Sequence, residues 1–79
     1  MTIGTALYLS GHFDTEAFRL FAQNRARLLS IRVSAAHLDC RRIVFLLHGV
    51  RDLIDMFIMA CVLGPANCLV TDWNEEGLP

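Results

Sequence analysis

Lysine is absent from this sequence, and all seven basic residues are arginine. The formal net charge is only −1. The chain therefore lacks the positive field that draws a protein to nucleic acid or to anionic lipid, and we expect neither nucleic acid nor a membrane as a partner. A Cys-x-x-Cys pair is also missing, and the three cysteines, Cys40, Cys61 and Cys68, form an odd set. With no recognisable signal peptide, reduced thiols in a cytoplasmic protein are the simplest interpretation.

A long hydrophobic run is missing as well. The longest apolar stretch, Leu53 to Leu63, contains Asp55 and is much shorter than the ~20 residues of a membrane-spanning helix. We find no linker and no tandem repeat, so we expect one domain over residues 1–79. A domain of this size buries only ~60–65% of its unfolded surface. Because 54% of the residues are hydrophobic, we expect a partner subunit to cover part of the apolar surplus.

The first third of the chain predicts a strand followed by a helix. Ile3 to Ser10 is rich in small and β-favouring residues, and Gly11 is predicted to end this strand. Asp14 or Thr15 is a suitable N-cap for the helix that follows. The positions that recur at helical spacing after this cap, with an arginine at the edge of the apolar stripe, are Phe18, Phe21, Ala22, Arg25, Ala26 and Leu29.

Two further strands are predicted in the middle of the chain. Residues 31–36 have a strand-like composition, and residues 38–41 form a polar connection. Ile43 to Leu47 is continuously apolar, which is expected of a strand that is covered on both faces or lies in the centre of its sheet. Gly49 is predicted to end this strand. The short connection between the two strands indicates a hairpin.

The last part of the chain predicts a second helix and a final strand. Asp52 is a plausible N-cap, and Gly64-Pro65 stops the helix. The predicted core stripe of this helix consists of Leu53, Ile54, Phe57, Ile58 and Cys61. Residues 67–74 are predicted to form a strand, and residues 75–79 a frayed tail. The order βαββαβ predicts an α+β ferredoxin-like sandwich, a four-stranded antiparallel sheet with both helices on one face.

Several apolar side chains are predicted to lie outside the core. Met56, Met59, Val62 and Leu63 project from the second helix on the side away from its core stripe. Exposed apolar faces mark interfaces, and methionine suits adaptable contacts, so a homo-oligomer through these residues is one interpretation. The other is a hydrophobic helix partly covered by the tail. Tyr8 and Trp73 are expected on the open face of the sheet, where they favour packing or a dimer contact over base stacking.

Ser10 to Arg19 carries the clearest chemical signal. Gly11 provides a turn, and the first N–H groups of the following helix have no partner and carry partial positive charge. Arg19, one turn into the helix, completes a plausible anion site. Asp14 and Glu16 lie in the same turn. Their carboxylates compete for the N–H donors and repel an anion.

Two stretches of the sequence resemble the motifs of the acylphosphatase family. The first family motif is G-x-V-Q-G-V-x-F-R, and here it reads Gly11-His12-Phe13-Asp14-Thr15-Glu16-Ala17-Phe18-Arg19. The second is G-W-V-x-N-x3-G-x-V-x5-G, and here it reads Val33-Ser34-Ala35-Ala36-His37, then Arg41, Ile43 and Gly49. The interval from Arg19 to His37 keeps the family spacing without a gap. The resemblance covers about Leu7 to Trp73 and implies the same small βαββαβ domain.

The resemblance also implies an activity, the hydrolysis of a carboxyl-phosphate anhydride. In the family, backbone N–H groups between two glycines cradle the phosphoryl group, an arginine completes the clamp and an asparagine orients the attacking water. Transferred to this chain, the anion-binding positions are Gly11, His12, Thr15 and Arg19, and the catalytic positions are Arg19 and His37. His37 stands where the family has asparagine, and a neutral imidazole can also hold a water.

The motifs depart from the family pattern at positions that matter for phosphate. Thr15 replaces a glycine, Asp14 a glutamine and Glu16 a valine, and in the second motif Ser34 replaces the aromatic residue and Arg41 a glycine. A carboxylate in contact with a phosphate dianion costs several kcal/mol at low effective dielectric. One charge-assisted bond from an arginine contributes only ~1.5–3 kcal/mol. The free-energy balance therefore opposes phosphate binding wherever one of these carboxylates points into the anion site.

The sequence therefore favours a degraded catalytic site on an acylphosphatase-like fold. The leading hypothesis is a non-enzymatic domain that assembles through its apolar surface or binds a small anionic ligand near Arg19. The alternatives are an active acylphosphatase, with Arg19 binding phosphate and His37 orienting water, and a regulatory small-ligand module. A metal site at His12, Asp14 and His37 is disfavoured by their separation in sequence, so we expect neither metal nor cofactor.

Overall fold

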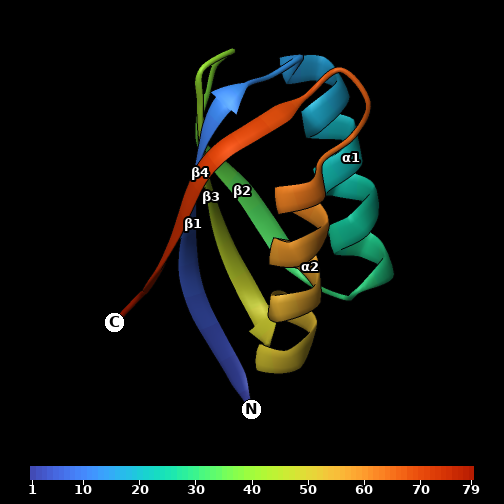
Figure 1. Ribbon diagram of the computed structural model, residues 1–79. Helices are drawn as coiled ribbons and strands as arrows, with labels where there is room; N and C mark the ends of the chain where they lie inside the picture. Colours follow the sequence, from blue (N-terminus) through green and yellow to red (C-terminus); the bar gives the residue numbers. More distant parts are fainter.

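The computed structural model describes residues 1–79 as a four-stranded antiparallel sheet with two helices on one face (Figure 1). The bounds of its elements are β1 Thr2–His12, α1 Thr15–Leu28, β2 Arg32–Leu38, β3 Arg42–Val50, α2 Arg51–Leu63 and β4 Leu69–Gly77. The strand order across the sheet is β2-β3-β1-β4, and every neighbouring pair is antiparallel. The predicted ferredoxin-like βαββαβ sandwich is confirmed.

Alternation along the two central strands determines which side chains form the core. Leu7 in β1 lies opposite Phe45 in β3, and both are buried. Cross-strand partners point to the same face of a sheet, here the face that the helices cover. Phe18 of α1 and Phe57 of α2 place their ring centroids 6.1 and 6.3 Å from that of Phe45. Each fully buried side chain of this size contributes about 1.5–3 kcal/mol, so this one core layer fixes the helices on the sheet.

β1 continues past the glycine that was predicted to end it. Gly11 and His12 still pair with β4, opposite Val70 and Leu69, after a bulge that shifts the register. A Cβ at Gly11 would lie 1.9 Å from the carbonyl oxygen of Leu69, so only glycine permits this approach of two backbones. The bulge therefore positions the residues that connect β1 to α1.

The predicted boundaries around β3 and α2 are wrong by a few residues. β3 continues through Gly49 to Val50, and α2 begins directly at Arg51. The N-cap position is Val50, and no side chain caps the helix, so Asp52 is not the N-cap that the sequence suggested. A strand that passes directly into a helix leaves no loop residue to act as a cap. β2 also extends to Leu38, into the predicted connection.

The prediction of a frayed tail after residue 74 is wrong. β4 begins at Leu69 and extends to Gly77, while Asn67, predicted to start the strand, has a positive φ of 66° and lies before it. The buried Thr5 hydroxyl donates a 3.0 Å hydrogen bond to the Glu75 carboxylate. Arg51 donates to the same carboxylate at 2.9 Å. These contacts join the end of β4 to β1 and to α2.

The expectation that Tyr8 and Trp73 share the open face of the sheet is also wrong. Trp73 pairs with Leu9, which is fully buried, and Tyr8 pairs with Asn74. Because adjacent residues of a strand point to opposite faces, Trp73 lies on the helix side and Tyr8 on the open side. Neither helix has the length and apolar character that crossing a membrane requires.

Candidate functional site

The connection between β1 and α1 contains the candidate anion site. Thr15 is the first residue of α1, and Asp14 is its N-cap. The Asp14 Oδ1 atom accepts a hydrogen bond of 3.1 Å from the Ala17 amide. The prediction of an N-cap at this point is confirmed. The cap uses one of the N–H groups that an anion at this helix end would otherwise receive.

Two further backbone donors near this connection are also used within the protein. The Gly11 amide donates to the Arg41 carbonyl at 3.0 Å, and the Phe13 amide donates to the Cys40 carbonyl at 2.8 Å. Both acceptors belong to the loop between β2 and β3, which therefore packs against the end of β1. The Asp14 amide has no hydrogen-bond partner within the protein. Of these three amides, only that of Asp14 remains available to a ligand, and the amides of Thr15 and Glu16, in the first turn of α1, likewise have no partner within the protein.

Arg19 lies one turn into α1 and pairs with an acid of its own helix. Its Nη2 atom donates to Glu16 Oε1 at 2.6 Å. The side chains of Arg19 and Glu16 are 42% and 67% exposed, so water screens this pair. An exposed i,i+3 pair contributes only ~0.2–1 kcal/mol. Beside Arg19 lies a small hollow of about 100 Å³ between α1 and β2, to which Val33 and Ala35 contribute.

His37 lies at a bulge in β2, where the register against β3 shifts between Ala35 and His37. Its Nε2 atom is 2.5 Å from Asp39 Oδ2. The backbone amide of Arg41, the side chain of His37 and the amide of Arg42 hold the pKa of Asp39 at about 2. His37 does not line the hollow beside Arg19. The two predicted catalytic side chains thus each have a carboxylate partner, and they do not hydrogen bond to one another.

The remaining predicted anion-site residues are placed as follows. His12 is the last residue of β1 and pairs with Leu69 of β4, so it belongs to the sheet. Thr15 has a helical backbone, and it is not among the residues with positive φ. No cluster of three or more His, Cys, Asp or Glu side chains suitable for a metal ion is present.

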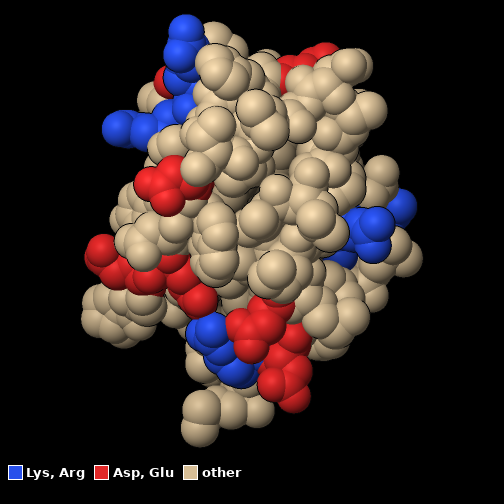
Figure 2. All heavy atoms as spheres, in the orientation of Figure 1, with Lys and Arg blue, Asp and Glu red and all other residues tan.

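The largest hollow of the molecule lies elsewhere, between α1 and α2. Its volume is about 620 Å³. Figure 2 shows that uncharged surface covers the middle of this side of the molecule, over the two helices. The residues that line it are Phe21, Arg25, Asp55, Met56, Met59, Ala60, Leu63 and Gly64. We call it the interhelical hollow.

The sequence predicted only part of the interhelical hollow. Met56, Met59 and Leu63 are 57%, 53% and 82% exposed, as their place on the outer side of α2 predicted. Val62, predicted on the same side, is instead half-buried and packs against the core. Phe21 was assigned to the apolar stripe of α1 and is only half-buried, whereas Arg25, predicted at the edge of that stripe, is exposed. The small side chains at positions 60 and 64 were the available signal, because they leave space that larger residues would fill.

The cysteines differ in accessibility. All three are free thiols, of which Cys40 is exposed and Cys61 is buried. Burial raises the pKa of the Cys61 thiol to about 12. Cys68 is half-buried, and its thiol lies 3.8 Å from the Asp14 carbonyl oxygen. Cys61 is therefore an unreactive core residue, and the thiols form no disulfide.

Comparison with known proteins identifies the class of fold. No protein-family model and no curated protein sequence matches this chain. An acylphosphatase from Coxiella burnetii superposes with a TM-score of 0.88 at 20% identity, covering 99% of this chain and 82% of that one. An acylphosphatase from Bacillus subtilis superposes with a TM-score of 0.86 at 22% identity, covering 99% of this chain and 86% of that one. The chain therefore has an acylphosphatase-like fold.

Proposed function

We propose that this chain is a non-catalytic acylphosphatase-like domain that associates with a second copy through the apolar face of α2. The observation that carries the first part is that three backbone donors of this connection are used within the protein. The amides of Gly11 and Phe13 donate to carbonyls of the β2–β3 loop, and the Asp14 carboxylate occupies the Ala17 amide. A phosphoryl group needs such donors free and preorganised. Breaking internal bonds to release them makes phosphate binding weaker.

Charge adds to the effect of the lost donors. Asp14 and Glu16 stand at the start of α1, one on each side of Thr15. Two unit charges 4 Å apart repel by about 1 kcal/mol in water and about 4 kcal/mol at an effective dielectric of 20. Arg19 offsets part of this repulsion, but it is shared with Glu16. We infer that the connection between β1 and α1 binds phosphate poorly and does not support turnover.

Hydrolysis of benzoyl phosphate tests the absence of catalysis. We expect the protein to hydrolyse it no faster than buffer does. Hydrolysis that disappears in Arg19→Ala would contradict this part of the proposal. The triple variant Asp14→Gln, Thr15→Gly, Glu16→Val is the matched test of the cause, because it removes both acids and the β-branched residue. Its affinity for inorganic phosphate, measured by calorimetry, should exceed that of the original chain.

The apolar face of α2 supports the proposal of self-association. Met56, Met59 and Leu63 expose large apolar side chains on one helix. Exposed apolar patches of this kind mark protein interfaces, and association removes them from water. The net charge of −1 gives little repulsion between two copies.

Light scattering over a range of protein concentrations measures the association. We expect a mass that rises towards that of a dimer, and Met59→Glu should shift it back towards the monomer. Leu20→Glu is the control, because Leu20 is also an exposed apolar residue of a helix but lies outside the interhelical hollow. A mass that stays monomeric, or that responds equally to both substitutions, contradicts association through α2.

A second candidate function is an active acylphosphatase, and one observation favours it. The Arg19–Glu16 pair is exposed and therefore weak, so Arg19 can turn to an incoming phosphoryl group at little cost. In this hypothesis His37 orients the water, and the acids of the connection point to solvent. The two structures to which the chain is similar are both acylphosphatases. The benzoyl phosphate assay separates the two candidates.

A further inference from the structure

Arg25 differs from the other arginines on this side of the molecule because it has no polar partner. Arg19 is bound to Glu16, and Arg51 to Asp55 and Glu75. Arg25 makes no salt bridge and no side-chain hydrogen bond, and its guanidinium carbon lies 5.5 Å from the centroid of the Phe21 ring. A cation held against an aromatic ring is oriented but keeps its N–H donors free.

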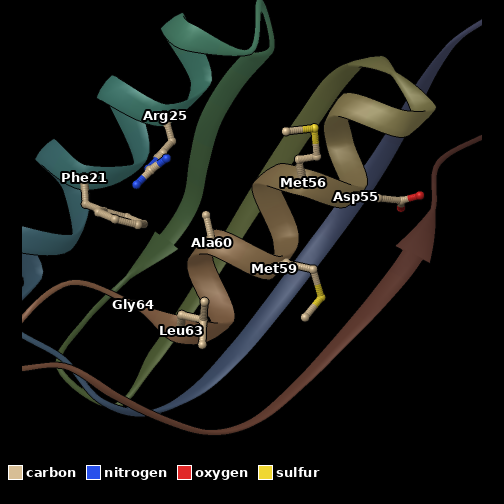
Figure 3. A pocket seen from close by; sticks show the side chains of 8 residues that line it. All are labelled: Phe21, Arg25, Asp55, Met56, Met59, Ala60, Leu63 and Gly64. Atoms are coloured by element: carbon tan, nitrogen blue, oxygen red, sulfur yellow. The ribbon is translucent and has the colours of Figure 1, made fainter.

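The free donors of Arg25 face an apolar space. Figure 3 shows Arg25 and Phe21 pointing from α1 towards α2, with Ala60 opposite them. The methyl group of Ala60 leaves the middle of the interhelical hollow open, and Met56, Met59 and Leu63 surround it from α2. The volume of about 620 Å³ is in the range of small-molecule sites. One fixed cation beside an apolar space is suited to a molecule with one negative group and an apolar body.

The charge distribution around the hollow also orients such a molecule. Asp55 is the only acid that lines the hollow, and its carboxylate accepts a 2.6 Å hydrogen bond from Arg51. Figure 3 shows Asp55 pointing away from Arg25, towards β4. Asp55 therefore does not neutralise Arg25, and it repels an anion at the opposite rim.

We propose that the interhelical hollow binds an apolar monocarboxylate, with its carboxylate on Arg25 and its hydrocarbon body against Met59, Ala60 and Leu63. A planar guanidinium binds a carboxylate through two parallel hydrogen bonds, which suits this headgroup better than a spherical anion. Methionine side chains adapt to hydrocarbon of varied shape. Because the same side chains form the proposed association surface, the ligand also excludes the second copy. This consequence rests on the proposed self-association, whereas binding itself does not.

Sodium octanoate is the probe, titrated into dilute, monomeric protein and followed by calorimetry and by ¹⁵N NMR. We expect saturable binding with shifts at residues 21, 25, 59, 60 and 63. Arg25→Gln should weaken it about tenfold through loss of the charge-assisted bonds. Arg27→Gln is the matched control because Arg27 lies on the same helix outside the hollow and contacts Asn24. It should change the affinity less than twofold.

Further measurements test whether the ligand occupies the hollow, whether its carboxylate is recognised and whether it competes with a second copy. Ala60→Phe should abolish binding by filling the hollow, and 1-octanol should bind the original chain and Arg25→Gln equally. In concentrated protein, octanoate should lower the mass measured by light scattering. No octanoate binding, or equal affinity for Arg25→Gln, overturns the proposal, and a dimer that octanoate cannot displace overturns the competition between the ligand and the second copy. Octanoate binding to a chain that stays monomeric at all concentrations supports the carboxylate site and contradicts self-association instead.

Discussion

The connection before α1 and the interhelical hollow both include residues of α1, but they differ in whether their polar groups have partners within the protein. In the connection, polar groups find partners a few residues away or in the next loop, as the amide of Phe13 and the carboxylate of Asp14 do. In the hollow, apolar side chains of α2 face solvent, and Arg25 has no acid beside it. A region whose groups already have internal partners gains little from a ligand. The comparison therefore supports the proposal that binding occurs away from the site that the sequence motif indicates.

Thiol labelling should give the largest difference between the two regions. Cys40 is in the loop that packs on the connection and is exposed, whereas Cys61 lies on the buried side of α2 with a pKa raised to about 12. We expect an aromatic disulfide reagent at pH 8 to label Cys40 at the rate of a free thiol. Cys61 should react at least about a thousandfold more slowly, because labelling requires unfolding. Mass spectrometry of digested samples measures both rates. Rapid labelling of Cys61 would show that α2 is loosely packed.

Gly11→Ala should have the largest effect on the stability of the connection. The added methyl group would meet the Leu69 carbonyl oxygen at 1.9 Å, so the bulge between β1 and β4 must rearrange. We expect the free energy of unfolding to fall by about 2–3 kcal/mol in urea denaturation. Gly77→Ala is the control, because a Cβ there has nothing within 4 Å. Similar losses for the two variants would reject the close approach at the bulge.

Asp14→Ala should have a smaller effect that still distinguishes the capping acid from its neighbour. Loss of the bond to the Ala17 amide should cost about 1 kcal/mol. Glu16→Ala removes only the exposed pair with Arg19, so its cost should stay within about 0.5 kcal/mol. Both values come from urea denaturation at pH 7. If Glu16→Ala costs more than Asp14→Ala, the roles assigned to the two acids are reversed.

Asp39 should give the smallest effect on stability, and this effect should change with pH only in acid. Its pKa is lowered from 3.8 to about 2 in the folded chain, so its carboxylate stabilises the fold above pH 4. This contribution should decline as the pH falls from about 4 to about 2. Comparison of urea midpoints for the original chain and Asp39→Asn measures it. The difference between the two should shrink over this window, and a constant difference would mean that the contacts of Asp39 with Arg41 and His37 are not made.

The sequence predicted the fold well because periodicity and caps are local signals. The stripe around Phe18 and the cap at Asp14 are both readable from a few neighbouring residues, and both are confirmed. Residues 75–77 were misjudged because their acidic composition is typical of a tail. Their place in β4 depends on Thr5 and Arg51, which are far away in the sequence.

The candidate site was harder to predict for the same reason. The motif spacing located Arg19 and His37, and the i,i+3 spacing indicated the pairing of Arg19 with Glu16, but the pairing of His37 with Asp39 was not predicted. The carbonyls of Cys40 and Arg41 that occupy the amides of β1 belong to a different loop, and no local pattern reveals such a contact. Likewise, helical spacing assigned Arg25 to a stripe but could not show whether α2 lay close enough to cover it.

The place of β1 in the middle of the sheet has a consequence for how this chain is made. One neighbour, β4, is the last strand in sequence, and the Thr5–Glu75 contact joins residues 70 positions apart. During synthesis on the ribosome, the edge of β1 that pairs with β4 therefore stays unpaired until nearly all of the described chain has emerged. Contacts so distant in sequence slow folding, and an open strand edge recruits other chains. Nascent chains are therefore most prone to aggregation just before β4 has been synthesised and has paired with β1.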